Sequence, residues 1–585
     1  MKSSFLHTIL FLCSAFVLNA QEIPAGGDGL VDSTKLKYSK LTKEEGMVEV
    51  VSENNSTTLI ATTIKQPQFI YNLGVRIPLI SKNITPEQPM LLSFQARTLE
   101  SSLETAEAKI SWIYKQSESS DPKDVIQRTV SLSQKWQTYY LPFKALKTSN
   151  GNDVLSMLFG FTPQKFEIKD IQLQLYPKNF DFEKLPKTKI TYAGMEANAP
   201  WRVEAEKRIE AHRKGNFEIA FSVKGKKVQN TNVHLNLQKH AFSFGAAINA
   251  EDIVKDVRHF DAVQKMFTAI VFENDLKMKK WTLVKKRPII VEAIDKLNES
   301  NIKVKGHALV WPSFRYMSEN IRANKDNPEK VKELVFSHIK SITEATKGKI
   351  SHWDVLNEVY TNKELQNIFG GSEDILFEAF QKLKEYDHKA ERFINEYGII
   401  SGGGINKTKQ DWYYNFVKTI DAKTGGLLDG VGMQSHIGSD LTPPEKVIEI
   451  LNRFSDLRKK ISISEFTLDI LDDDIKAQYT NDYMTAAFSQ PSVSEFLFWG
   501  YYEPSNPKAG LLDENFQLTK MGKAYSNLVH NKWQTNISKN TDANGKISDR
   551  GFYGTYQYDF TLDGKFYKGS FEVKPESKNQ IKIAL

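Results

Sequence analysis

The sequence has 585 residues, which is too long for one hydrophobic core, so several domains are expected. Hydrophobic residues make up 40% and charged residues 25%, a balance that excludes a largely disordered chain. The 78 lysines and arginines are interspersed with 71 acidic residues, so the net charge of +7 forms no basic cluster and argues against nucleic-acid binding.

The first residues, MKSSFLHTILFLCSAFVLNAQE, have the pattern of a secretory signal: Lys2, an apolar run over 5–18 and a small residue at Ala20. We expect residues 1–20 to be removed and the protein to be secreted, with no transmembrane segment. Lipidation of Cys13 is a competing but less favoured interpretation, because Leu12 is bulky. Cys13 is the single cysteine, so the mature chain would lack disulfides, thiol nucleophiles and thiolate metal ligands.

Residues 21–185 contain short runs with period-two alternation, such as AKISWIYKQ and IQLQLYP. This pattern predicts an antiparallel, jelly-roll-like β-sandwich. Its aromatic residues Trp112, Trp136, Tyr139 and Tyr140 alternate within the expected strands, which favours core positions. Residues 186–200 contain Pro186 and Pro200 and are expected to be a linker.

Residues 201–533 have a different pattern, in which apolar strands alternate with amphipathic helices. The expected strands are AFSFGAAIN, MFTAIVFEN, KVKGHALVW, SHWDVLNEV, ERFINEYGI, GVGMQSHIG, ISISEFTLD and EFLFWGYYE. Eight strands alternating with helices predict an α/β fold, the (β/α)8 TIM barrel, whose active site lies at the carboxyl ends of the strands. Residues 534–585 contain Asn544-Gly545 and Asp563-Gly564, which are hairpin signals and predict a small β appendage.

Polar and aromatic residues recur at the carboxyl ends of the expected strands. They are Glu273, Asn274, His307, Trp311, Asn357, Glu358, Asn395, Glu396, Gln434, His436, Glu465 and Trp499. Such a set around one mouth suits an uncharged, polyhydroxylated ligand. Taken singly, each residue has a structural interpretation: a glutamate at a helix start, a histidine bonded within the core, or a tryptophan packed in the barrel.

Hydrolysis of a glycosidic bond needs two carboxyl groups, one protonated at the leaving oxygen and one ionised at the anomeric carbon. Glu358 and Glu465 end the fourth and seventh expected strands and are the candidates. A separation of about 5–5.5 Å between them would predict retention of anomeric configuration through a covalent intermediate.

The ordered motifs GHALVW, WDVLNE, GVGMQSHI, ISEF and FWG resemble glycoside hydrolase family 10 over about 202–533. The resemblance implies an endo-β-1,4-xylanase acting on xylan. It implies that Glu358 is the acid/base and Glu465 the nucleophile, with Asn357 bonding the sugar 2-hydroxyl and His436 orienting Glu465. The sugar-binding positions that it implies are Glu273, Asn274, Lys277, His307, Trp311, Gln434 and Trp499. The sandwich ahead of the barrel resembles carbohydrate-binding modules, as in plant-type members.

Four departures from the family pattern concern the walls and supports of the site. Pro312 follows Trp311 where many members have histidine, Met278 replaces a tryptophan, and the loop in WTLVKKRPIIVEAI is short. Thr467 stands where the family has the aspartate that supports the histidine bonded to the nucleophile, although a bulge could bring Asp469 to that place.

The leading prediction is therefore a monomeric, secreted, retaining xylanase without cofactor or metal, since no glycine-rich phosphate loop or metal-ligand spacing occurs. One alternative keeps the mechanism but acts on another β-glycan or a decorated xylan. The other is a barrel that binds carbohydrate without cleaving it.

Overall fold

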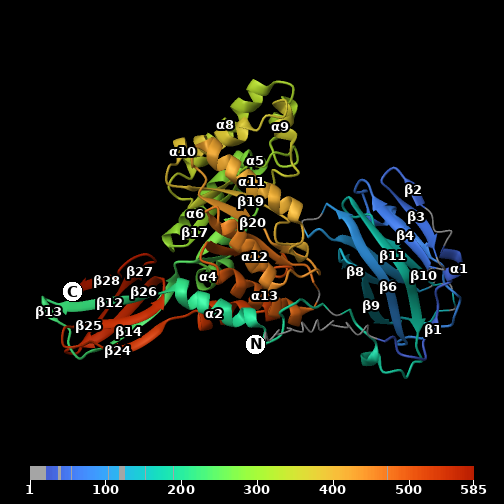
Figure 1. Cartoon of the computed structure of the whole chain (residues 1–585), viewed down its shortest axis with the longest axis horizontal. Coiled ribbons are helices and arrows are strands. Elements are labelled where there is room, and N and C mark those ends of the chain that lie inside the picture. Colours follow the sequence, from blue (N-terminus) through green and yellow to red (C-terminus); the bar gives the residue numbers. More distant parts are fainter. Residues whose placement is uncertain are drawn as a thin grey trace, which may run out of the picture. The chain divides into compact units, whose positions relative to one another are not determined.

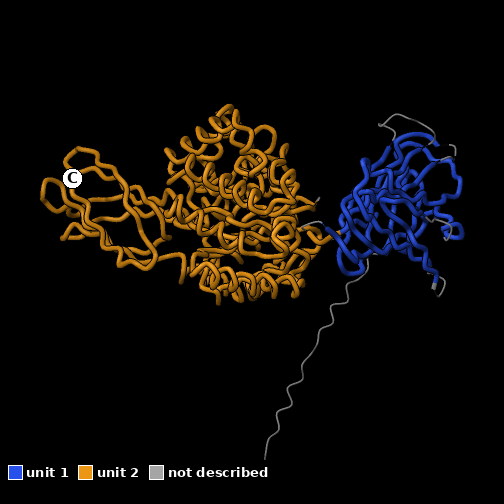
Figure 2. The backbone as a smooth tube through the Cα atoms, turned by 90° about the horizontal axis from the view of Figure 1, so that it is seen from above, with its two compact units in different colours: residues 1–102, 108–189 blue, residues 103–107, 190–585 orange. Residues whose placement is uncertain are grey.

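A computed structural model of the chain describes residues 22–36, 41–53, 56–102, 105–116, 125–149, 151, 153–188, 190–470 and 472–585. The expected signal sequence and Cys13 lie outside the described residues. The chain divides into two compact units, residues 1–102 with 108–189 and residues 103–107 with 190–585 (Figure 2).

The first unit is a sandwich of two antiparallel sheets. One sheet has the strand order β2-β3-β4-β11-β6-β9 with β1 paired to β11, and the other has the order β5-β10-β7-β8. The strands are β1 (Asp28–Gly29), β2 (Leu41–Lys43), β3 (Gly46–Glu53), β4 (Ser56–Thr63), β5 (Gly74–Ile77), β6 (Pro89–Ser101), β7 (Ala108–Lys115), β8 (Val125–Leu132), β9 (Gln137–Lys144), β10 (Val154–Leu158) and β11 (Gln164–Leu175), with short helices α1 (Ser33–Leu36), η1 (Ile70–Asn72) and η3 (Phe182–Lys184). The predicted β-sandwich is confirmed.

Aromatic residues from both sheets fill the core of the sandwich. Trp112 on β7 and Phe94 on β6 have ring centroids 5.2 Å apart, and Tyr139 stacks on Phe94 at 5.0 Å. The prediction of a core position is wrong for Trp136, which is 37% exposed because it precedes β9 rather than lying within it. Tyr140, which is half-buried, is intermediate.

The second unit contains a closed barrel of parallel strands, seen at the centre of Figure 1. Its strands are β15 (Ser243–Ile248), β16 (Ala269–Phe272), β17 (Lys303–Val310), β18 (His352–Asn357), β19 (Glu391–Glu396), β20 (Gly430–Met433), β22 (Lys460–Leu468) and β23 (Val493–Phe498), with a short extension β21 (His436–Ile437) beside β22. Neighbours in sequence are neighbours in the sheet, and the β20–β22 and β15–β23 pairings complete the ring. The predicted (β/α)8 barrel is confirmed.

Helices surround the barrel because each amphipathic segment buries its apolar face against the strands. They are α3 (Ala250–Lys255), α4 (Val257–Met266), α5 (Met278–Trp281), η4 (Val284–Lys286), α6 (Arg287–Glu299), α7 (Glu319–Ala323), α8 (Pro328–Ala345), α9 (Glu364–Ile368), α10 (Asp374–Tyr386), η5 (Gly402–Gly404), α11 (Lys407–Thr424), α12 (Pro444–Ser455), α13 (Asp473–Phe488), α14 (Lys520–Ser526) and the π-helix η6 (Asn527–Lys532).

The end of the expected linker is attached to the barrel. Tyr192 donates a hydrogen bond to Asp482 of α13 at 2.8 Å, and Arg202 of α2 (Pro200–Arg213) binds both oxygens of the same carboxylate at 2.5 and 2.6 Å. Because Asp482 is only 1% exposed, this pairing holds the chain where it enters the barrel unit.

The β appendage is formed by strands from both ends of the second unit, so it is not confined to residues 534–585. Strands β12 (Lys214–Val223), β13 (Lys226–Lys227) and β14 (Asn232–His240) precede the barrel, and β24 (Asn536–Asn540), β25 (Lys546–Phe552), β26 (Gly554–Leu562), β27 (Lys565–Val573) and β28 (Gln580–Ala584) follow it. β12 pairs with β25 and β28, and β14 pairs with β24 and β26. Pairing between strands some 300 residues apart leaves no periodic trace in the sequence, whereas Asp563-Gly564 does form the expected tight turn, with φ of 49° and 73°.

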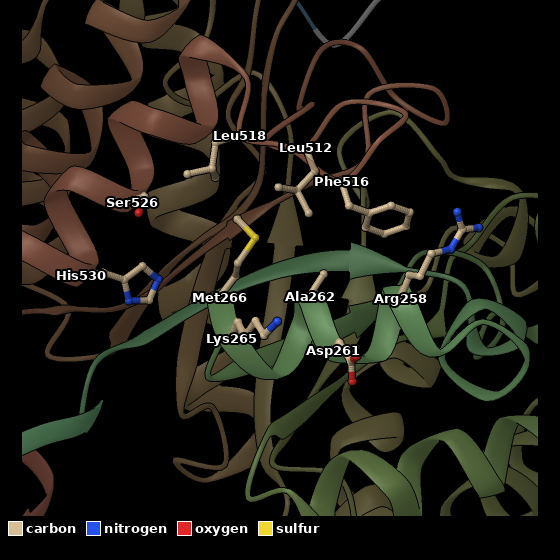
Figure 3. Close-up of a pocket in the computed structure, with 10 residues that line it drawn as sticks. All are labelled: Arg258, Asp261, Ala262, Lys265, Met266, Leu512, Phe516, Leu518, Ser526 and His530. Atoms are coloured by element: carbon tan, nitrogen blue, oxygen red, sulfur yellow. The ribbon is translucent and has the colours of Figure 1, made fainter.

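Within the described part of the chain, every helix is too short or too polar to cross a membrane. A hollow of about 420 Å³ lies on the outside of the barrel, beside α4. Figure 3 shows Met266, Leu512, Phe516 and His530 around it. None of the strand-end residues lines this hollow.

Candidate active site

Glu358 and Glu465 are positioned by the two strands that the sequence identified. Glu358 directly follows β18, with a left-handed φ of 54°, and its N–H donates to the carbonyl of Asn395 at 3.0 Å. Glu465 lies within β22. Their exposed fractions are 8% and 4%, so both carboxyl groups are largely withdrawn from bulk water.

Both oxygens of Glu465 have partners from neighbouring strands. Asn395 of β19 donates from Nδ2 to Oε1 at 2.6 Å, and His436 of β21 has Nε2 at 3.2 Å from Oε2. Asn395 is itself held by Ser464, whose hydroxyl donates to Oδ1 at 2.6 Å. The orientation of Glu465 is therefore fixed from two sides.

A line of amides connects the two carboxyl groups. Gln434 donates from Nε2 to Glu358 Oε1 at 3.1 Å and to Asn357 Oδ1 at 3.4 Å. Asn395 donates to the same Asn357 oxygen at 3.0 Å and to Glu465. Five residues from four strands thus form one hydrogen-bonded chain, with a carboxyl group at each end.

The Thr467 side chain lies beside His436. The Thr467 hydroxyl is 3.0 Å from His436 Nδ1, because β21 and β22 pair with these two residues in register. The Asp469 carboxylate instead forms an ion pair with Lys508 at 2.9 Å. A His436 ring protonated at Nε2 alone donates there to the Glu465 carboxylate and accepts at Nδ1 from the threonine hydroxyl.

A wall of aromatic rings with one lysine lies beside the carboxyl groups. The ring of His307 is 5.1 Å from Trp499 and 5.9 Å from Trp311. Trp311 stacks on Tyr316 at 3.5 Å, and the Lys277 ammonium lies 5.1 Å from the Trp311 ring. Indole faces of this kind are suited to stacking on sugar rings.

Glu273, Asn274 and Lys277 follow β16 and form a small polar group. Asn274 donates to Glu273 at 3.1 Å, and Lys277 donates to the Asn274 side-chain oxygen at 3.0 Å. All three side chains are half-buried, so they retain access to a ligand. The lysine connects this group to the tryptophan wall.

Several buried polar atoms of the site have no hydrogen-bond partner among the described residues. They are Asn357 Nδ2, Gln434 Oε1, His307 Nε2 and Trp311 Nε1. Asn357 Nδ2 and Trp311 Nε1 are donors and Gln434 Oε1 is an acceptor, so the site can pair with both the donor and the acceptor of a ligand hydroxyl group.

The structure brings together all eleven site residues expected from the sequence at one mouth of the barrel. The sequence identifies Asn395 as a strand-end residue but assigns it no role. Its position among the other polar strand-end residues was the signal that could have indicated a role in the site. Within the described ranges, no cluster of three or more histidine or acidic side chains is arranged to hold a metal ion.

Residues 234–521 match the model of glycosyl hydrolase family 10. The chain is 29% identical over 401 residues to the anti-sigma-I factor RsgI6 of Acetivibrio thermocellus, a match that covers 67% of this chain and 49% of that protein. It is 26% identical over 386 residues to endo-1,4-beta-xylanase 1 of Arabidopsis thaliana, covering 64% of this chain and 40% of that protein. The chain thus spans half or less of the length of these two relatives.

Among solved structures, xylanase 10B of Thermotoga petrophila in complex with xylobiose is 23% identical, with a TM-score of 0.43. That match covers 50% of this chain and 95% of the other. Native xylanase 10B of Thermotoga maritima is also 23% identical, with a TM-score of 0.44, and covers 50% of this chain and 96% of the other.

Proposed function

Since this chain belongs to glycosyl hydrolase family 10 through its barrel, we propose that it is a retaining endo-β-1,4-xylanase. The observation that carries the proposal is the pair of buried carboxyl groups, Glu358 and Glu465, connected by a line of amides at the mouth of the barrel. Xylan is the substrate that the comparisons favour, because the relatives include several endo-1,4-beta-xylanases.

In the first step of the proposed reaction, a Glu465 oxygen attacks the anomeric carbon while Glu358 gives its proton to the leaving glycosidic oxygen. The bond from the anomeric carbon to the leaving sugar breaks, and a glycosyl ester of Glu465 forms. In the second step Glu358 takes a proton from water, whose oxygen attacks the anomeric carbon and releases Glu465. Two inversions give net retention of configuration.

The neighbouring side chains have supporting roles in this proposal. Asn395 and His436 hold Glu465 in the attacking orientation, and Gln434 fixes Glu358 beside the leaving oxygen. The unpartnered Asn357 Nδ2 donates to the sugar 2-hydroxyl. Hydrogen bonds at that hydroxyl strengthen in the transition state of glycoside hydrolysis.

The sugar-binding walls complete the proposed site. Trp311, Trp499 and His307 enclose the sugar at the point of cleavage, and Glu273, Asn274 and Lys277 bind the sugars on the non-reducing side. The half-buried, mutually bonded arrangement of the last three supports this role. We further propose that the protein is a secreted monomer whose β-sandwich binds carbohydrate.

The test is to incubate the protein starting at Gln21 with glucuronoxylan, arabinoxylan and mixed-linkage β-glucan. Product length and anomeric configuration are followed over time by chromatography and proton NMR. We expect early release of mid-length xylo-oligosaccharides with the β configuration. Cleavage of glucan alone would be consistent with the mechanism but would contradict xylan as the substrate. Binding to a polymer without cleavage would indicate a barrel that only binds carbohydrate.

The role of Thr467 leads to a smaller prediction. In Thr467→Val the shape is kept but His436 Nδ1 loses its hydroxyl partner, so the ring can rotate away from Glu465. We expect kcat/KM on xylan to fall about 3- to 10-fold, the usual worth of one hydrogen bond. Thr467→Ser keeps the hydroxyl and should retain nearly full activity. Equal activity of the valine and serine variants would refute this role.

A further inference from the structure

The floor of the barrel, at the amino-terminal ends of its strands, contains a hollow of about 960 Å³. Lys303 begins β17, His352 begins β18 and Lys460 begins β22, and all three side chains line this hollow. Glu358 and Glu465 lie toward the carboxyl ends of the strands, and the six residues of β18 span about 20 Å from His352 to Glu358. The hollow is therefore separate from the proposed active site.

Positive side chains predominate in the lining of the hollow. Six lysine and arginine side chains line it, against three glutamates. Two of the lysines are neutralised by carboxylates: Lys460 is paired with Glu391, and Lys459 is 2.7 Å from Asp421. The charges of these two lysines are not available to a ligand.

Four cations of the lining have no acidic partner among the residues that the structure describes. They are Arg213, Lys303, Lys389 and Arg458. Of the three glutamates, Glu391 is paired with Lys460 and Glu495 is 3.6 Å from Lys305. Glu576 lies on the exposed surface of the lining. The hollow therefore carries an excess of positive charge.

Arg213, at the end of α2, is a half-buried cation held by neutral groups. Its Nε donates to the Phe488 carbonyl at 2.7 Å, and its Nη2 donates to the carbonyls of Gln490 and Val493 at 2.5 and 2.8 Å. The guanidinium carbon also lies 4.8 Å from the ring of Phe242. Burial lowers the pKa of the guanidinium to about 9, so the group is still charged at neutral pH. An anion in the hollow would offset the cost of burying this charge.

Lys389 and Arg458 follow the carboxyl ends of α10 and α12, and both are exposed. A cation at such a place can stabilise the helix end by donating to its last carbonyls. In the described chain, however, both residues form hydrogen bonds through the backbone and not through the charged group. Lys303 donates to the neutral hydroxyl of Ser243 at 3.2 Å. These three charges are therefore available to a ligand.

We propose that the hollow is a second carbohydrate-binding site, which takes an oligosaccharide that carries a carboxylate. Its volume is at the upper end of the range for small-ligand sites and far exceeds that of a free inorganic anion. The Arg458 guanidinium can bind a carboxylate through two parallel hydrogen bonds, and the half-buried ring of Tyr553 offers apolar surface to a sugar. The inference rests on the proposed function, because cleavage of glucuronoxylan would release oligosaccharides with uronate side chains.

The experiment is a calorimetric titration of the Glu465→Ala protein, which is expected to leave the ligand uncleaved. The ligands are xylotetraose with one glucuronic acid side chain, unsubstituted xylotetraose and glucose 6-phosphate. The double variant Lys389→Ala/Arg458→Ala is made in the same protein, and both side chains are exposed, so folding should be unaffected. The matched control is Lys418→Ala/Lys523→Ala, which removes two positive charges from exposed positions of α11 and α14 outside the hollow.

We expect the protein to bind one more molecule of the acidic than of the neutral tetrasaccharide, the additional one at the floor of the barrel. In Lys389→Ala/Arg458→Ala the Kd of this additional site should rise about 10-fold or more, because hydrogen bonds to charged groups are lost. The binding shared by both ligands should be unchanged. The control variant should keep the additional site, and an increase of about tenfold in ionic strength should weaken that site selectively.

Equal stoichiometry for the acidic and neutral ligands would overturn the inference. So would an additional acidic site that Lys389→Ala/Arg458→Ala leaves intact, or a floor site that takes glucose 6-phosphate and not the uronate. A wild-type protein that cleaves no polymer would overturn the proposed function alone, because the titration detects the floor site without any cleavage. The two failures are therefore distinguishable.

Discussion

Glu465→Ala is expected to lower kcat on xylan by at least about 10⁴-fold, because no covalent intermediate can form without the nucleophile. The alanine leaves a small cavity beside Asn395 and His436, whose side chains donated to the lost carboxylate. Binding of xylo-oligosaccharides should persist, because the tryptophan wall and the Glu273 group are untouched. Calorimetric titration alongside the rate measurement separates the two effects.

Azide provides a sharper control for the role of Glu465. In the Glu465→Ala cavity an azide ion can attack the anomeric carbon of an activated aryl xyloside from the face that the carboxylate occupied. The product should be the α-xylosyl azide, with inverted configuration, and the rate should recover in part. A β-xylosyl azide from this variant would contradict the assignment of Glu465 as nucleophile.

Glu358→Gln is expected to reduce kcat/KM on xylan by about 10²- to 10⁴-fold, the usual contribution of general acid–base catalysis. The amide keeps the shape and the contact with Gln434 but cannot protonate the leaving oxygen. The loss should nearly vanish for formation of the glycosyl-enzyme from a dinitrophenyl glycoside, whose leaving group needs no proton. Pre-steady-state release of dinitrophenol measures this step.

Azide also provides the matched comparison for Glu358→Gln, because its azide product should have the opposite anomeric configuration to that of Glu465→Ala. In Glu358→Gln the glycosyl ester on Glu465 forms, and azide then attacks it from the side left by the departed sugar. We expect the β-xylosyl azide from Glu358→Gln, against the α-azide from Glu465→Ala. An equal loss of rate for xylan and for the dinitrophenyl glycoside would show that Glu358 does not act as the acid.

The sequence alone predicted the barrel fold and the location of its mouth. Hydrophobic periodicity is local, so alternating strand and helix patterns predict the (β/α)8 fold, and the fold places the carboxyl ends of all strands on one face. Glu358 and Glu465, together with the tryptophans and amides at other strand ends, could therefore be proposed as candidate site residues before any coordinates were known. The family match over 234–521 covers all the strands of the barrel.

The partners of these residues were decided by the tertiary structure. Thr467 follows Glu465 by two residues and so lies on the same strand face, but only the β21–β22 register places its hydroxyl on His436 and leaves Asp469 to Lys508. Asn395 gains its role from packing between Asn357 and Glu465, which come from different strands.

The sequence likewise could not predict the pairing between strands that are far apart in the chain. Strands β12 and β14 precede the barrel but complete the sheets of the appendage. Local periodicity determines which residues form a strand and which face they share. The contacts between strands depend on register and closure of the barrel, which arise from the packing of the whole chain.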